Sequence, residues 1–156
     1  MAKNNLFGFT FIEVVIAVAI IGILSTLGIS SYVTFNQTKT LEHESYKMVE
    51  ALELGKKRAL SGEKICGTYA GTYTFDWTTT SYSLTPNGCS QLFSYLFPAA
   101  IQASSSGSVT FQPFGLGTGS STCIMLHHEI SDKCRKITLN TAGTVSEQKE
   151  SDCSCP

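Results

Sequence analysis

Hydrophobic and polar residues divide the chain into three successive segments. Residues 9–29 are apolar almost without interruption, and no charged residue occurs between Val14 and Ser30. As a helix, this segment would extend about 30 Å, the thickness of the hydrocarbon core of a bilayer. Lys3 and the amino terminus supply the positive charge before it, and none follows closely. The pattern predicts a membrane helix with a cytoplasmic N-terminus and the remainder of the chain outside.

Beyond residue 29 the apolar positions follow a helical spacing. Four of them recur at intervals of seven, four and seven residues: Leu41, Met48, Leu52 and Ala59. Charged residues fill much of the remaining surface, as on an amphipathic helix. No proline precedes Pro86, and Gly62 is a typical helix stop. The pattern predicts one helix over residues 9–61, apolar in its first half and amphipathic in its second.

The third segment, residues 63–156, alternates runs of β-branched and aromatic residues with turn residues. The runs expected to form strands are 68–77, 79–85, 109–111, 123–129, 135–141 and 144–146. Residues 92–97 fit a strand or a short helix, and residues 103–107 are expected to form a loop. A long helix followed by antiparallel strands predicts an α+β fold, with a sheet or a pair of sheets packed on the amphipathic half of the helix.

Composition and motifs exclude several functions. The chain has 156 residues, of which 15% are charged, and its net charge is −1. Bulk electrostatic attraction to DNA or anionic lipid is therefore not expected. The sequence contains no nucleophile elbow, zinc-protease helix or phosphate-binding loop, and no paired carboxylates suited to catalysis. We expect neither an enzyme nor a bound cofactor or metal.

Six cysteines occur in the C-terminal part: Cys66, Cys89, Cys123, Cys134, Cys153 and Cys155. An even set of this kind indicates disulfides and an oxidising compartment. Cys123 and Cys134 flank one predicted hairpin, Cys66 and Cys89 bracket another, and these are the natural pairs. The two tail cysteines are awkward to join directly, so each could instead tie the tail to the sheet. A zinc site with ligands from His127, His128 and the two tail cysteines is the weaker alternative, because no C-x-x-C or H-x-x-x-H spacing occurs.

A hexapeptide at the start of the apolar segment carries a more specific signal. Residues 8–13 read Gly-Phe-Thr-Phe-Ile-Glu and follow a short polar leader. This arrangement resembles the class III signal of type IV prepilins and type II secretion pseudopilins, although Phe11 stands where the family often has leucine. The resemblance implies that a membrane prepilin peptidase cuts between Gly8 and Phe9 on the cytoplasmic side and methylates the new amino terminus at Phe9.

Glu13 is unusual because it is a carboxylate within an apolar helix. Such a group costs roughly 2.5–3.5 kcal/mol at a bilayer centre and usually has a partner and a role. Neither a cleaved secretory signal nor a plain single-pass anchor explains it. The resemblance makes Glu13 the family's glutamate, at the fifth position after cleavage. In a bundle, its carboxylate can pair with the Phe9 amine of a neighbouring subunit and set the axial register.

The order of elements near the C-terminus narrows the resemblance. The expected elements come in a definite order: a strand that contains Phe111, a Pro- and Gly-rich turn at residues 113–119, two strands joined by a charged turn, and then Ala142-Gly143. This order is similar to that of minor pilins and H-type minor pseudopilins. Members of that group end in two β-sheets packed on the helix. The resemblance divides the chain into a leader (1–8), a transmembrane or fibre-core helix (9–30), its amphipathic continuation (31–62) and a disulfide-stabilised β-rich domain (63–156).

The resemblance also implies a role, a location and partners. The role is that of a structural subunit of a type IV pilus or type II secretion pseudopilus. The chain would enter the cytoplasmic membrane and then an extracytoplasmic or cell-surface fibre. Its partners would be membrane lipid before assembly, the prepilin peptidase/N-methyltransferase, assembly platform proteins and other pilin or pseudopilin subunits. The sequence leaves open which of the two machines it joins, and a plain membrane-anchored extracytoplasmic domain is one alternative.

DNA binding by a competence-pilus subunit is the other alternative. Some relatives of this pattern bind DNA through basic residues near the C-terminal turn, and Lys133, Arg135 and Lys136 cluster in this region. Phosphate binding needs several cations on one face without nearby acids. Acidic residues follow at positions 147, 150 and 152. Nucleic acid is therefore not the expected partner.

Overall fold

The structure is a computed structural model that describes residues 9–62, 64–65, 68–69, 71–150 and 152–155. Residues 26–28, 30, 64–65 and 68–69 are described by their backbone alone. The leader 1–8, with Gly8 of the expected cleavage site, and Cys66 lie outside the described residues. The chain divides into two compact units, Met1–Asn36 and Gln37–Pro156, which are treated separately below.

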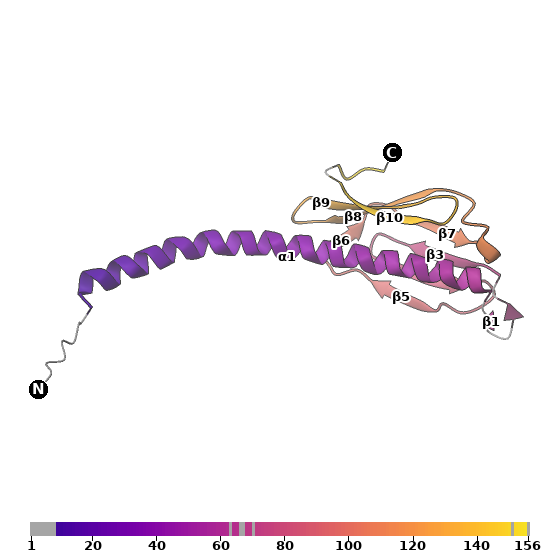
Figure 1. Cartoon of the computed structure of the whole chain (residues 1–156), viewed down its shortest axis with the longest axis horizontal. Helices are drawn as coiled ribbons and strands as arrows, with labels where there is room; N and C mark the ends of the chain where they lie inside the picture. Colours follow the sequence, from indigo (N-terminus) through magenta and orange to yellow (C-terminus); the bar gives the residue numbers. More distant parts are fainter. Residues whose placement is uncertain (1–8, 63, 66–67, 70, 151, 156) are drawn as a thin grey trace, which may run out of the picture. The chain divides into compact units, whose positions relative to one another are not determined.

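One helix, α1, spans Phe11–Ser61 (Figure 1). Its first turn is closed at Thr10, whose backbone oxygen accepts a hydrogen bond from the Glu13 amide at 3.1 Å. The helix ends where the sequence predicts, because Gly62 has a φ of 59°, the left-handed conformation that commonly terminates helices. The predicted long helix is therefore confirmed, with a start two residues later than expected.

In the first unit, the apolar side chains of α1 are exposed. Phe9 and Phe11 have 83% and 85% of their surface accessible, and the large apolar residues from Ile12 to Leu24 are each at least 45% exposed. Within the described residues, no helix meets the combined length and hydropathy needed to cross a bilayer. The membrane-spanning role of residues 9–30 therefore stays a prediction.

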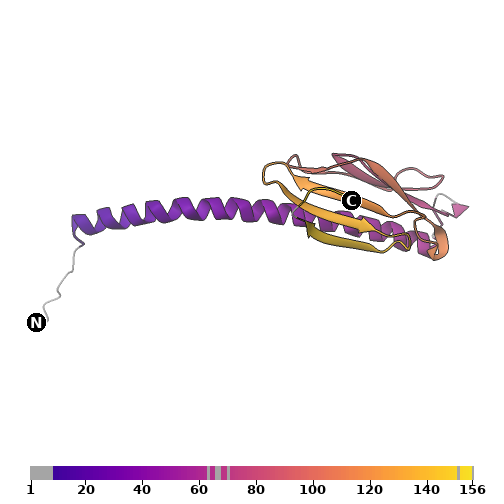
Figure 2. The same ribbon diagram turned by 90° about the horizontal axis from the view of Figure 1, so that it is seen from above.

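The second unit contains two four-stranded antiparallel sheets (Figure 2). The first has the order β5-β4-β3-β7, from β3 (Tyr73–Trp77), β4 (Ser81–Pro86), β5 (Phe93–Leu96) and β7 (Gly107–Phe111). The second has the order β10-β9-β8-β6, from β6 (Ile101–Ala103), β8 (Thr122–His128), β9 (Lys133–Leu139) and β10 (Val145–Glu150). A two-stranded pair, β1 (Lys64–Ile65) and β2 (Thr68–Tyr69), and a short 3-10 helix, η1 (Pro113–Gly115), complete the unit. The predicted α+β fold with a pair of sheets is confirmed.

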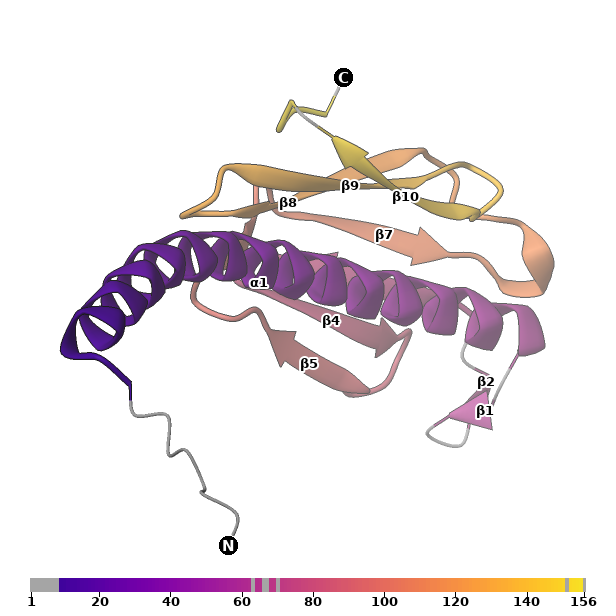
Figure 3. The same cartoon turned by 60° about the vertical axis from the view of Figure 1, so that its left-hand side comes forward.

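Both sheets pack on one side of the helix in this unit and leave the opposite side bare (Figure 3). The predicted apolar stripe of the helix is buried: Leu41, Met48, Leu52 and Ala59 are each at most 1% exposed. The strands contribute alternate residues to the same core, as in the buried–intermediate alternation along β3. Helical and strand periodicity thus converge on one hydrophobic core.

Gly55 lies where the helix comes closest to the first sheet. A Cβ atom at this position would be 2.9 Å from Leu84 Cδ1 and 3.1 Å from the Phe111 ring. Both neighbours are buried in the core at 0% and 1% exposure. The glycine lowers helix propensity, but its lack of a side chain permits this close contact.

Most predicted strands appear with bounds shifted by a few residues, the predicted strand 68–77 is divided into β2 and β3, and residues 92–97 contain a strand, β5, rather than a helix. Two further differences are larger. Residues 101–103, partly assigned to a loop by sequence, form β6, because Ile101 and Ala103 are buried at 1% and pair with β8. Strand β10 continues to Glu150, beyond the expected end at residue 146, through an antiparallel pairing with β9. Its run of polar residues carries no apolar alternation, so only the ladder with β9 identifies it as a strand.

Candidate functional site

Phe9 and Glu13 occupy one face of the helix start in the first unit. Together with Val14, Ala17 and Val18 they line a hollow of about 360 Å³. Glu13 is exposed, and its backbone amide also contacts Thr10 Oγ1 at 3.4 Å. Glu13 is the one charged residue among the five that line this hollow, and Phe9, the amino-terminal residue expected after cleavage, is another.

The three predicted DNA-contact residues do not form one basic face. Arg135 and Lys136 are successive residues of β9, so their side chains leave opposite faces of the strand. Arg135 is paired with Glu42 at 3.4 Å and with Glu147 at 3.2 Å, and only 14% of its side chain is exposed. Lys136 is paired with Glu150 at 3.6 Å, and Lys133 donates a hydrogen bond to Thr38. These cations are held by partners within the chain.

Arg135 instead belongs to a polar network that joins the helix to the second sheet. Glu42 accepts a hydrogen bond from Lys39 at 2.8 Å, and Glu147 accepts one from the Ser45 hydroxyl at 2.6 Å. The hydrogen bond from Lys39 is the main cause that lowers the pKa of Glu42 below its ordinary value of 4.5. Partial burial of the carboxyl acts in the opposite direction, and the charge of Arg135 lowers the pKa further.

This network predicts a loss of stability in acid. The pKa of Glu42 is depressed in the folded state, so its ionised form stabilises the fold above pH 4.5, and this contribution disappears as the pH falls through the folded-state pKa. Urea unfolding between about pH 5 and 2 should show a shallower pH dependence for Glu42→Gln than for the unchanged chain. Identical profiles for the two proteins would contradict this assignment.

A second polar cluster joins the helix to the first sheet. Glu44, which the sequence pattern treats as a surface charge, is only 3% exposed. Lys47 donates to Glu44 Oε1 at 2.9 Å and to the Tyr95 hydroxyl at 2.8 Å. The hydrogen bond with Tyr95 is the largest cause that raises the pKa of Lys47, and the hydrogen bond with Glu44 is the next. The signal was present in the sequence, because position 44 is three residues after Leu41 and falls on the buried helix face.

The disulfides differ from the natural pairs expected from the sequence. Cys123 is bonded to Cys155 and Cys134 to Cys153, with Cα–Cα distances of 5.9 and 5.5 Å. The pairing of Cys123 with Cys134 is wrong, because the register of β8 and β9 sets Cys123 opposite Thr138, four residues away from Cys134. The alternative, in which each tail cysteine ties the tail to the sheet, is confirmed. Cys89 is disulfide-bonded, and its predicted pairing with Cys66 falls outside the described residues.

The tied tail covers the outer face of the second sheet. Met125 and Cys134 alternate with residues of the main core and lie outside it, yet they are only 1% and 2% exposed. The two disulfides hold the tail residues 152–155 against this face. Figure 1 shows the end of the chain returning over β8 and β9. The tail therefore acts as a covalently attached cover on the sheet.

The zinc alternative is not supported by this arrangement. The tail cysteines are oxidised, and His127 and His128 are successive residues of β8 that face opposite ways. His128 is 3% exposed, and its Nδ1 accepts a hydrogen bond from the Ile130 amide at 3.3 Å. In the part of the chain that the structure describes, no three His, Cys, Asp or Glu side chains gather as metal ligands.

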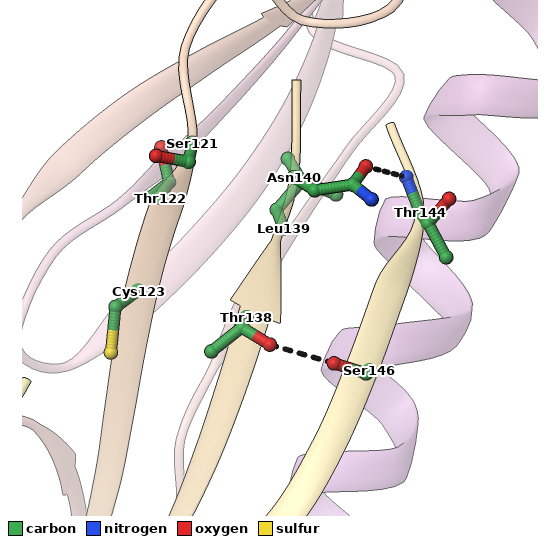
Figure 4. Close-up of a pocket in the computed structure, with 8 residues that line it drawn as sticks. All are labelled: Ser121, Thr122, Cys123, Thr138, Leu139, Asn140, Thr144 and Ser146. Atoms are coloured by element: carbon green, nitrogen blue, oxygen red, sulfur yellow. Dashed lines mark hydrogen bonds between the residues drawn. The ribbon is translucent and has the colours of Figure 1, made fainter. Parts of the chain in front are cut away.

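A polar hollow of about 370 Å³ lies at the ends of β8, β9 and β10 (Figure 4). Its lining residues are uncharged: Ser121, Thr122, Cys123, Thr138, Leu139, Asn140, Thr144 and Ser146. The Thr138 and Ser146 hydroxyls are 2.6 Å apart, and the Thr144 amide donates to Asn140 Oδ1 at 2.8 Å. The sequence did not single out this hollow, because its residues come from three separate segments, 121–123, 138–140 and 144–146. Without a cation, it lacks the charge that phosphate binding requires.

Comparison with known proteins adds a match at the N-terminal end. Residues 3–29 match the family model described as the prokaryotic N-terminal methylation motif. No curated protein and no solved structure matches the chain. The matched segment contains Gly8, Phe9 and Glu13, the three residues of the predicted processing and assembly site. Residues 3–29 therefore carry the N-terminal methylation motif typical of a type IV pilin-like prepilin.

Proposed function

We propose that the chain is a structural subunit of a type IV pilus or type II secretion pseudopilus, and not an enzyme. The observation that carries the proposal is the methylation motif at residues 3–29, joined to an apolar helix. In this proposal, prepilin peptidase cuts between Gly8 and Phe9 and methylates Phe9. Assembly platform proteins then transfer the subunit from the cytoplasmic membrane to an extracytoplasmic fibre.

The exposed apolar helix of the first unit supports a fibre role. Large exposed apolar surfaces mark contacts with other proteins or with lipid. In this proposal, membrane lipid covers residues 9–30 before assembly and the helices of other subunits cover them afterwards. The membrane location rests on the motif rather than on the hydropathy of the described helix.

Glu13 has a specific role in this proposal. Glu13 and Phe9 line the same hollow at the start of the helix. In a bundle of such helices, the carboxylate of one subunit pairs with the methylated amine of the next, and each charge offsets the burial cost of the other. The pair sets the axial register of the subunits, while the surrounding apolar side chains supply the packing area.

The two-sheet domain supports a place in the minor pilin or H-type minor pseudopilin group. The notable features are two four-stranded sheets on the amphipathic half of the helix and a tail held by disulfides. The DNA-binding alternative has less support, because Lys133, Arg135 and Lys136 each have a partner within the chain.

The N-terminal mass of the protein tests the proposal. In cells that contain a prepilin peptidase, the full chain is expected to yield a mature protein that begins with N-methylated Phe9. Intact mass and peptide sequencing measure this directly, and Gly8→Val is expected to retain the leader. A protein that still begins with Met1, or that is cut near Ser30, would contradict the proposal. In the same cells, Glu13→Gln should be processed normally but recovered poorly in sheared fibres.

A further inference from the structure

Three large apolar side chains are exposed where the segment between β7 and β8 meets the end of α1 (Figure 1 and Figure 3). Phe114 and Leu116 are 79% and 73% exposed, and Leu60 of the helix is 44% exposed. A Cβ atom at Gly115, between the first two, would lie 3.3 Å from Leu60 Cδ2, and one at Gly62 would lie 3.5 Å from the Phe114 ring. The three side chains therefore form one exposed cluster, and such clusters mark contacts with proteins or membranes.

The backbone holds the loop of this cluster in one conformation. Phe114 has a φ of 55°, a left-handed conformation that aromatic residues rarely adopt. A Cβ atom at Gly117 would lie 1.9 Å from the backbone oxygen of Thr141, so glycine is required there. The Gln112 amide donates to the Gly117 oxygen at 2.8 Å, and the Thr118 amide donates to the Thr141 oxygen at 2.9 Å. Because the strained Phe114 is mostly exposed, packing within the chain does not account for its conformation, and strain of this kind is typical of binding sites.

The charged residues around the exposed cluster are basic. Among the described residues of the helix end (56–62), the loop (112–121) and the turn beside it (140–144), three are charged: Lys56, Lys57 and Arg58. Lys56 and Lys57 precede Leu60 by four and three residues, so both flank it on the helix surface, and Lys56 lines a small hollow with Leu60. On the described helix, the nearest acidic residue before Leu60 is Glu53, seven residues or about 10 Å earlier. Glu63 lies outside the described residues.

Apolar side chains with flanking lysines fit the surface of a bilayer that contains anionic lipid. At such a surface the apolar groups enter the boundary between headgroups and acyl chains, while the lysines attract the anionic headgroups. A protein partner fits less well, because lysine is depleted at the centre of protein interfaces. The hydrogen bonds within the loop also lower the cost of bringing its backbone close to hydrocarbon.

We propose that the exposed cluster of Phe114, Leu116 and Leu60, together with Lys56 and Lys57, docks onto a bilayer surface that contains anionic lipid. This contact goes beyond the proposed function, because it uses the second unit of the chain and not the apolar helix of the first. A few partly inserted side chains bind reversibly. Several copies held in one assembly would bind the same surface more tightly.

Quenching by brominated lipid tests the contact in the full chain. The protein is held through its apolar helix in nanodiscs of neutral phosphatidylcholine, and Leu116→Trp provides a fluorescent group in the loop. The native Trp77 is only 4% exposed and contributes a constant background. Added vesicles of brominated phosphatidylglycerol should quench the new indole, and high salt should weaken the quenching. Vesicles of brominated phosphatidylcholine should quench it much less.

Ile130→Trp is the matched control. Ile130 is 74% exposed, as Leu116 is, but it is close in sequence to the acidic residues Glu129 and Asp132. Its indole should not be quenched by either kind of vesicle. Absence of quenching in Leu116→Trp, equal quenching at the two positions, or equal quenching by neutral and anionic vesicles would each overturn the proposal.

Two further variants, made in the Leu116→Trp chain, separate binding from folding. Phe114→Gly removes a large apolar group and suits a φ of 55°, so affinity for anionic vesicles should fall by about tenfold while the midpoint of urea unfolding changes little. Lys56→Gln with Lys57→Gln should lower the affinity by about tenfold as well. Unchanged affinity in both variants would refute the contact. N-terminal processing at Phe9 does not depend on these residues, so the proposed function is tested separately.

Discussion

Replacement of both tail cysteines by alanine, in Cys153→Ala with Cys155→Ala, is expected to lower the free energy of unfolding of the domain by about 6 kcal/mol. The two disulfides join residues that are 32 and 19 positions apart in the chain. Loss of each such closure costs about 3 kcal/mol through the entropy of the unfolded chain. A domain of ordinary stability has about 5–15 kcal/mol in total, so this variant should be near its unfolding threshold.

Urea unfolding under non-reducing conditions measures the effect. Removal of one disulfide with both of its cysteines, as in Cys134→Ala with Cys153→Ala, should give about half of the loss. The native pairing should also be visible as Cys123–Cys155 and Cys134–Cys153 peptides after non-reducing digestion. Release of the tail should expose Met125, which would then be oxidised faster by peroxide. A combined loss below about 2 kcal/mol would show that the tail contributes little.

Substitution of Gly55 by leucine is expected to lower the free energy of unfolding by about 2 kcal/mol. The new side chain would have to enter the space occupied by Leu84 and Phe111, which are buried and cannot move toward solvent. Overpacking of this kind typically costs 1–3 kcal/mol. The gain in helix propensity of about 1 kcal/mol offsets only part of the strain.

Gly71→Leu is the matched control for this change. A Cβ atom at Gly71 would meet no heavy atom within 4 Å, so the same substitution adds bulk without a clash. Thermal and urea unfolding of the two variants should differ clearly, with Gly71→Leu close to the unchanged chain. Equal stability of Gly55→Leu and the unchanged chain would mean that the helix and the first sheet are not in the close contact described.

The disulfide pattern illustrates a limit of prediction from sequence. The spacing of Cys123 and Cys134 around a turn suggested a bond across a hairpin, but that inference assumes that the two residues lie opposite each other. Register decides this, and a shift of a few residues along a ladder moves two cysteines out of reach. The pairing depends on where β8 meets β9 and on the path of the tail, and neither is encoded locally.

The burial of charged residues also depends on segments that are far apart in the chain. The sequence treats Glu44 as a surface charge and Arg135 as a candidate DNA contact, yet both side chains, and that of Glu147, are largely buried between the helix and a sheet. Helical periodicity could have identified position 44, because it is in line with Leu41 and Met48. The partners of Arg135 come from the helix and from β10, so its ion pairs could not be foreseen from its own strand.

The sequence by itself determined the features that depend on residues close together in the chain. These are the long helix and its end at Ser61–Gly62, its buried stripe and the methylation motif around Gly8, Phe9 and Glu13. Periodicity, capping and a short motif are local signals. Only the tertiary structure decided the disulfide partners, the burial of the ion pairs, strand β6 and which side of the helix the sheets leave bare. Each of these depends on contacts between distant segments, whose register follows from the packing of the whole core.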